Sequence, residues 1–287
     1  GVAIVTPFNS DGSIDFPRLK NLINYIIDGG VEYLVSLGTT GETATLKHDE
    51  KKTIWKFTAE AVAGRVPLVA GIGGNNTAEV VESIQSFNNT GYDAILSVSP
   101  YYNKPTQEGI YQHYKAVAEA SPLPVILYNV PGRTGSNMSA ETTLRLAHDF
   151  DNIIGVKEAS ANFDQFNRII KDKPADFLFI SGDDPITLPM IAMGAVGVIS
   201  VVGNAIPTIL STMVRMCLDG KFAEALPLHY SLIEITSQFF AEGNPGGVKA
   251  ALKQLGICGD ALRLPLVNVS EGTESRISEE LKSLGLV

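Results

Sequence analysis

The sequence contains few cysteines and histidines, which argues against a disulfide framework and against a metal site. Its two cysteines, Cys217 and Cys258, form no CxxC pair, so we predict free thiols in a reducing, cytoplasmic compartment. The four histidines are far apart and show no HExxH or HxxxH spacing. This pattern disfavours a metal-dependent hydrolase or aldolase, and we expect no metal.

Long apolar runs and blocks of positive charge are also missing. The longest apolar run, Ile191–Val202, contains two glycines and is shorter than the roughly 20 residues that a membrane helix needs. Lys and Arg number 22 against 31 Asp and Glu, a formal net charge of −9. Because nucleic acids and anionic membranes attract positive fields, we predict neither as a partner.

The residues that are present are typical of a large folded α/β chain. Of 287 residues, 45% are hydrophobic and 18% are charged. Eight short apolar runs, often β-branched, are bounded by Gly, Pro, Asn or Asp, as strands buried on both faces are. The runs are Val2–Val5, Tyr33–Leu37, Leu68–Ala70, Ala94–Val98, Val125–Tyr128, Ile153–Lys157, Phe177–Ile180 and Val196–Val201.

Helical patterns alternate with these runs. Apolar residues between Leu19 and Ile27 recur at helical spacing, which gives a face suited to packing on a sheet. We predict helix starts at Asn76, Ser139 and Asp184, whose side chains can cap a first turn.

The alternation predicts an α/β fold, a (β/α)8 TIM barrel over residues 1–220. An open doubly wound sheet is the alternative, but no G-x-G-x-x-G follows the first run, which disfavours it. Residues 221–287 show helical periodicity without strands, so we predict a C-terminal helical appendage.

Polar residues follow several of the runs, at the strand ends where barrels hold their active sites. The turn Gly38–Glu42 offers hydroxyl and N–H groups to a carboxylate, or is an ordinary glycine turn. Tyr101 and Tyr102 are proton carriers or packing residues. Arg133 is a carboxylate anchor or a plain surface residue.

Lys157 closes the sixth run, and two interpretations stay open from its position alone. The side chain either extends to solvent from the strand end, or it is a desolvated amine that forms a Schiff base with a carbonyl substrate. Asp183 and Asp184 could form a carboxylate pair, although Asp184 before Pro185 is more simply a helix cap.

Four segments together resemble the signature regions of the pyruvate-dependent class I aldolase family that includes dihydrodipicolinate synthase and N-acetylneuraminate lyase. They are Gly38–Glu42, Tyr101–Asn103, Tyr128–Gly135 and Gly155–Ser160. The resemblance implies a lyase without metal or organic cofactor. Its reaction would be the Schiff-base condensation of pyruvate with L-aspartate-4-semialdehyde, the first committed step of lysine biosynthesis by the diaminopimelate pathway.

The resemblance also implies catalytic roles for single residues. Lys157 matches the lysine that forms the imine with pyruvate. Tyr128, Thr39 and Tyr102 match a tyrosine–threonine–tyrosine proton relay. In the family, the residue matching Tyr102 comes from a neighbouring subunit, so the resemblance implies a homotetramer built as a dimer of dimers.

Three further matches concern substrate binding. Thr40 matches a contact to the pyruvate carboxylate, and Ile199 matches a backbone contact nearby. Arg133 matches the arginine that receives the second substrate at the mouth of the pocket. The two adjacent threonines and the sequence after Arg133 resemble the synthase more than the neuraminate lyases.

A possible allosteric set matches the lysine-binding pocket of lysine-sensitive relatives. It consists of Ala44, His48, Lys51, Asn75, Glu79 and Tyr101. Lys51 departs from the pattern, because sensitive bacterial relatives often carry histidine or glutamate there. A second positive charge near bound lysine predicts weak or absent feedback inhibition.

One segment departs from the family, and two other functions stay open. Asn244–Lys249 contains glycines where many bacterial members carry bulkier residues, and we expect its effect on the C-terminal region rather than on the chemistry. A sister aldolase or lyase acting on a sugar-derived 2-keto acid is one alternative. The other is a catalytically silent metabolite-binding barrel, which the joint presence of the four catalytic residues opposes.

Overall fold

The computed structural model describes every residue from Gly1 to Val287. Contacts divide the chain into two compact units, Gly1–Leu68 together with Ser200–Val287, and Val69–Ile199. The first unit is therefore built from both ends of the chain, and the second from one continuous stretch. The predicted boundary between residues 220 and 221 stays a prediction.

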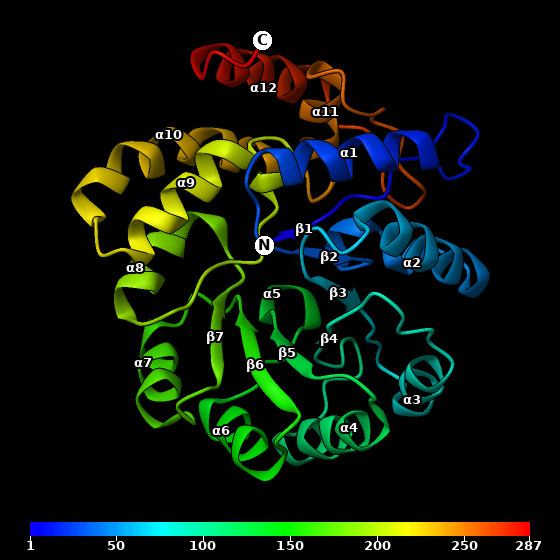
Figure 1. The fold of residues 1–287 in the computed structure, drawn as a ribbon, viewed down its shortest axis with the longest axis vertical. Helices are drawn as coiled ribbons and strands as arrows, with labels where there is room; N and C mark the ends of the chain where they lie inside the picture. The colour runs from blue at the N-terminus through cyan, green and yellow to red at the C-terminus, as the bar shows by residue number, and fades with distance from the viewer. The chain divides into compact units, whose positions relative to one another are not determined.

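The second unit is organised around five strands that pair in parallel and in chain order (Figure 1). The strands are β3 (Leu68–Gly71), β4 (Ala94–Val98), β5 (Val125–Asn129), β6 (Ile153–Glu158) and β7 (Leu178–Ser181). Their residues are almost all buried, because a parallel sheet needs cover on both faces. Continuous apolar runs satisfy this requirement, which is why the sequence revealed them.

Helices connect these strands, and Figure 1 shows α4, α6 and α7 along one side of β4–β7. The helices of this unit are α3 (Thr77–Gln85), α4 (Gln107–Ala120), α5 (Pro131–Thr134), α6 (Ala140–Asp149), α7 (Phe163–Asp172) and α8 (Thr187–Met193). The predicted starts at Asn76 and Ser139 are confirmed, because each side chain caps the helix after it. The start at Asp184 is wrong. A 3₁₀ turn occupies Asp184–Ile186 and α8 begins at Thr187, whose hydroxyl donates to the Asp183 carbonyl.

The first unit joins the two ends of the chain through its own short ladder. Strand β1 (Val2–Ala3) pairs in parallel with β2 (Leu34–Ser36) and bridges to Ser200. The Asn204 side chain accepts from Val5 N–H and donates to the Ala3 carbonyl. Six helices complete the unit. They are α1 (Phe16–Asp28), α2 (His48–Val62), α9 (Pro207–Leu218), α10 (Phe222–Phe240), α11 (Gly246–Gln254) and α12 (Glu271–Ser283).

The eighth predicted strand, Val196–Val201, is present only as isolated bridges. Val198 bridges to Ser181 and Ser200 bridges to Val2. Gly197 has a φ of +148°, which interrupts the regular extended backbone that a longer strand requires. The predicted C-terminal helices are present as α10, α11 and α12. None of the helices combines the length and the apolar character that crossing a membrane requires.

Candidate active site at the ends of β5 and β6

Tyr128 and Lys157 lie side by side at the carboxyl ends of two neighbouring strands. The register pairs Tyr128 on β5 with Lys157 on β6. The Lys157 Nζ lies 4.4 Å from the centroid of the Tyr128 ring, within the range of a cation–π contact. Both residues are buried, with exposures of 7% for Tyr128 and 5% for Lys157. A primary amine thus lies beside the aromatic ring of a tyrosine in a largely buried position.

The residues after β7 leave room for the lysine and place a carboxyl group near it. A Cβ on Gly182 would lie 3.1 Å from Lys157 Cε and 2.8 Å from Ala159 Cβ, so a side chain there would crowd the amine. Burial raises the pKa of the Asp183 carboxyl, Asp184 raises it further, and Lys157 lowers it. Asp183 is therefore within electrostatic reach of the amine.

Ile199 follows β7 in the chain, lies beside the end of that strand and is buried. Its backbone N–H donates to the Ser181 carbonyl at 2.9 Å, at the end of β7. Ser181 is in turn paired with Glu158 of β6. The predicted backbone contact at Ile199 therefore belongs to the same edge of strands as Lys157.

Tyr102 and Arg133 are exposed residues on two neighbouring segments, the loop after β4 and the short helix α5. The Tyr102 N–H donates to the Thr134 carbonyl at 3.3 Å, which ties the loop after β4 to helix α5, where Arg133 lies. Tyr102 adopts a φ of +72°, unusual for a bulky residue, and its side chain is 87% exposed. Very little of its own chain covers this phenol.

Thr39 and Thr40 belong to the first unit, in a 3₁₀ turn over Thr39–Gly41. Thr40 is buried, and its Oγ1 accepts a hydrogen bond of 2.9 Å from Asn244 Nδ2. The Thr6 hydroxyl donates to the Gly41 carbonyl at 2.7 Å. The turn is thus held by side chains from both ends of the chain.

A buried ion pair that the sequence analysis missed follows this turn. Lys249 Nζ lies 2.5 Å from Glu42 Oε1 and 2.8 Å from the Ala261 carbonyl, and both charged side chains are fully buried. The Arg263 N–H donates to Glu42 Oε2 at 3.1 Å. Burial lowers the pKa of Lys249, and Glu42 opposes this shift.

The effect of the segment Asn244–Lys249 is not limited to the C-terminal region, contrary to what the sequence led us to expect. Asn244 contacts Thr40 and Lys249 contacts Glu42, so the segment also supports the 3₁₀ turn at Thr39–Gly41, called the threonine turn below. A Cβ on Gly247 would lie 2.6 Å from Phe239 Cα. Only glycine allows α11 to approach α10 this closely.

The possible allosteric residues fall in both units. Ala44, His48 and Lys51 lie in or just before α2, in the first unit. Lys51 is half-buried, and burial lowers the pKa of its amine. In the second unit, Asn75 Nδ2 donates to the Tyr101 carbonyl at 3.1 Å, and Glu79 lies exposed in the first turn of α3.

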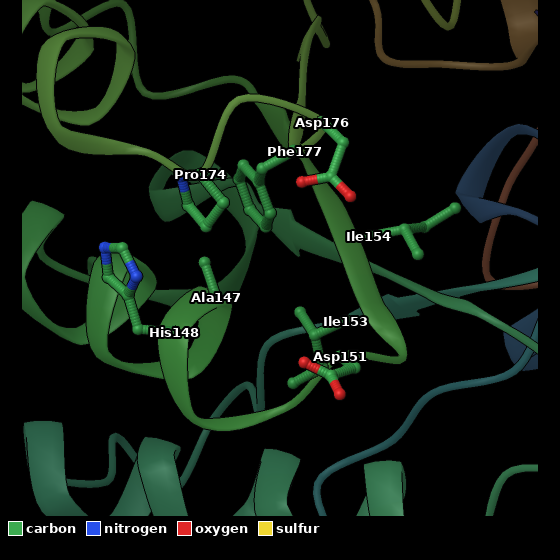
Figure 2. A pocket seen from close by; sticks show the side chains of 8 residues that line it. All are labelled: Ala147, His148, Asp151, Ile153, Ile154, Pro174, Asp176 and Phe177. Atoms are coloured by element: carbon green, nitrogen blue, oxygen red, sulfur yellow. The ribbon is translucent and has the colours of Figure 1, made fainter.

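A cavity of about 370 Å³ lies at the start of β6, at the end of the strand opposite to Lys157 (Figure 2). Ile153 and Ile154 line it at the start of β6, together with His148, Asp151 and Asp176. Lys157 is at the other end of the same strand, so this cavity has no part in its chemistry. No three His, Cys, Asp or Glu side chains gather where they could hold a metal ion.

Comparisons with known proteins place this chain in a family. The model of the dihydrodipicolinate synthetase family matches residues 1–284. The chain is 57% identical over 284 residues to a 4-hydroxy-tetrahydrodipicolinate synthase of Flavobacterium psychrophilum, covering 99% of this chain and 97% of that protein.

Solved structures agree along the whole chain. The dihydrodipicolinate synthase of Thermotoga maritima superposes with a TM-score of 0.97 at 40% identity, covering 100% of this chain and 98% of that one. The enzyme of Cyanidioschyzon merolae, solved with lysine bound, gives a TM-score of 0.96 at 39% identity, covering 100% and 97%. The predicted fold class, a (β/α)8 TIM barrel with C-terminal helices, is confirmed.

Proposed function

Because the chain belongs to the dihydrodipicolinate synthetase family, we propose that it is a lyase of lysine biosynthesis that condenses pyruvate with L-aspartate-4-semialdehyde. One observation carries the proposal most directly. The buried Lys157 amine lies 4.4 Å from the Tyr128 ring at the strand ends, so a nucleophile and a proton carrier are neighbours. A sugar-derived 2-keto acid as substrate is the alternative.

The chemistry follows from an amine beside a phenol. Lys157 Nζ attacks the keto carbon of pyruvate, and loss of water gives a protonated imine. This electron sink acidifies the methyl group, and loss of a proton gives an enamine. The enamine carbon attacks the aldehyde, and the substrate's own amine then attacks the imine carbon and expels Lys157. Tyr128 is proposed to move protons at Nζ.

We propose further roles for residues around this pair. Thr39 and Tyr102 complete the proton relay, and Thr40 and the Ile199 backbone hold the pyruvate carboxylate. The 87% exposure of Tyr102 is what a side chain supplied to a neighbouring subunit would show, in keeping with a homotetramer. A cytoplasmic location stays a prediction.

Arg133 is proposed to receive the carboxylate of the aldehyde substrate. We expect Arg133→Ala to lower kcat/KM for L-aspartate-4-semialdehyde by about 10- to 150-fold, because a charge-assisted hydrogen bond contributes about 1.5–3 kcal/mol. Imine formation with pyruvate alone should stay near the wild-type rate. Initial rates with the semialdehyde, with sialic acid and with 2-keto-3-deoxygluconate measure both the function and this effect. A wild type that turns over only a sugar acid would overturn the proposed substrate.

Feedback inhibition by L-lysine is proposed to be weak. The relative from Cyanidioschyzon merolae binds lysine, but in this chain Lys51 is half-buried at a matching position. Two ammonium groups about 8 Å apart repel by roughly 2 kcal/mol at an effective dielectric near 20, which is about thirtyfold in affinity.

A lysine titration of initial rates tests this inhibition, with Lys51→Glu as the matched variant. We expect the wild type to respond only in the millimolar range or above and the variant to respond at lower concentration. Strong inhibition of the wild type below about 0.1 mM would show that Lys51 does not repel the ligand.

A further inference from the structure

Glu158 carries a fully buried carboxyl group that the proposed reaction does not use. It follows Lys157 on β6, and successive side chains of a strand point to opposite faces of the sheet. The register sets Tyr128 beside Lys157 and Asn129 beside Glu158. The two reacting side chains therefore share one face, and the amide and the carboxyl group share the face behind it.

Three N–H donors surround the Glu158 carboxyl group. Asn129 Nδ2 lies 3.1 Å from both of its oxygens. Gln165 Nε2 lies 2.9 Å from Oε2, and the backbone nitrogen of Ser160 lies 2.9 Å from Oε1. Gln165 stands in the first turn of α7. One carboxyl group thus joins the end of β5, the end of β6 and the helix that follows.

Backbone groups of Met138 fix the orientation of both amides. The Met138 N–H donates to Asn129 Oδ1 at 3.0 Å, and Gln165 Nε2 donates to the Met138 carbonyl at 3.1 Å. Each amide must therefore present its nitrogen to Glu158. Burial raises the pKa of the Glu158 carboxyl, and the donors from Asn129, Ser160 and Gln165 lower it. A protonated carboxyl would find no acceptor among these partners, so the contacts are those of a carboxylate.

The loop before α6 closes the network. Asn129 Nδ2 also donates to Asn137 Oδ1 at 2.8 Å, and Asn137 Nδ2 donates to Gln165 Oε1 at 2.8 Å. Each of the three amides donates from its nitrogen and accepts at its oxygen within this group. Such a closed set has one low-energy arrangement, because a flipped amide would place like groups against each other.

We propose that Glu158 is a positioning residue for the Schiff-base reaction, which holds the ends of β5 and β6 so that the Lys157 amine stays beside Tyr128. The inference rests on the proposed function, because its readout is imine formation at Lys157. Glu158 is not among the residues proposed to contact the substrate. It acts through the backbone that it shares with Lys157 and through Asn129, which shares its backbone with Tyr128.

The test compares the rate of imine formation per folded molecule. Pyruvate is mixed with the protein, the reaction is stopped with borohydride at set times, and the labelled fraction is measured by mass spectrometry. We expect Glu158→Gln to react at least about tenfold more slowly, since a misplacement of about 1 Å costs on the order of 100-fold. A loss of stability alone would lower the folded fraction and leave this rate constant unchanged.

The chain offers a matched control in the same unit. Thr77 Oγ1 and His113 Nδ1 form a hydrogen bond of 2.9 Å between α3 and α4. Thr77→Val removes this bond, and we expect a lower unfolding temperature with a trapping rate within about twofold of wild type.

One more variant keeps the proposal testable if Glu158→Gln does not fold. Gln165→Leu removes one of the donors to Glu158 and should slow trapping about threefold or more. Wild-type rates in the folded single variants would overturn the proposal while leaving the proposed function intact. A wild type that traps no pyruvate would overturn both.

Discussion

Replacing Lys157 by arginine will abolish the covalent trapping of pyruvate and lower kcat by on the order of a thousandfold or more. The guanidinium group stays protonated and cannot attack a carbonyl carbon. The amine that this substitution removes is the one that lies buried beside the Tyr128 ring. The measurement is borohydride reduction in the presence of pyruvate, followed by mass mapping of the peptides.

Lys104→Arg is the control for this experiment. Lys104 is an exposed lysine on the loop after β4, so its replacement should leave both the label and the turnover unchanged. A label on Lys104 or on Lys249 in the wild type, or any label in the Lys157→Arg protein, would contradict the mechanism.

The same inactive chain tests where Tyr102 acts. Mixed oligomers of Lys157→Arg and Tyr102→Phe subunits should regain part of the activity if each site takes its phenol from a neighbour. In such mixtures some sites combine an intact Lys157 with an intact Tyr102. Verified mixed oligomers without any regained activity would place Tyr102 in the site of its own chain.

Lys249→Met should lower the free energy of unfolding by about 3–5 kcal/mol, because it leaves the Glu42 carboxylate buried without its cation. Both side chains are fully buried and lie 2.5 Å apart. For a chain of this size each kcal/mol shifts the unfolding temperature by about 2–4 °C, so the loss should be easily measured by thermal or urea unfolding.

Lys253→Met is the matched control, one turn further along α11. Lys253 is half exposed and pairs with Asp260 at 2.8 Å, and an exposed pair contributes about 0–1 kcal/mol. The double variant Lys249→Met/Glu42→Gln should recover part of the loss because no uncompensated charge remains. Equal losses of unfolding free energy for Lys249→Met and Lys253→Met would mean that burial of the ion pair does not determine the size of the destabilisation.

Strand positions could be predicted because a strand buried on both faces leaves a continuous apolar run. The run Ala94–Val98 matches β4 at both ends. The sixth predicted run ends at Lys157, whereas β6 continues to Glu158. A charged residue normally marks the end of a buried strand, and the partners that satisfy this carboxylate, such as Gln165, lie elsewhere in the chain.

The apolar runs also predicted the positions of single candidate site residues at strand ends. They could not predict contacts between residues that are distant in the sequence. Tyr128 and Lys157 each end an apolar run, so parallel pairing brings them together. Glu42 and Lys249 are separated by 207 positions, and each alone looks like an ordinary surface charge. Gly247 indicated a different contact, the close approach of α11 to α10, because glycine within a helix often marks the close approach of another backbone.

The order in which the chain is made differs from the order in which its contacts can form. The N-terminal part of the first unit accepts hydrogen bonds from the side chains of Asn204, Asn244 and Arg263. A ribosome produces these partners last, after the whole of Val69–Ile199 has emerged. The threonine turn, Thr39–Gly41, therefore has its Thr6 contact early but lacks its Asn244 contact until late in synthesis. Strands β3–β7, by contrast, meet their neighbours in the order in which they are made. The full set of contacts at this turn is thus acquired only late in translation, when α11 is complete.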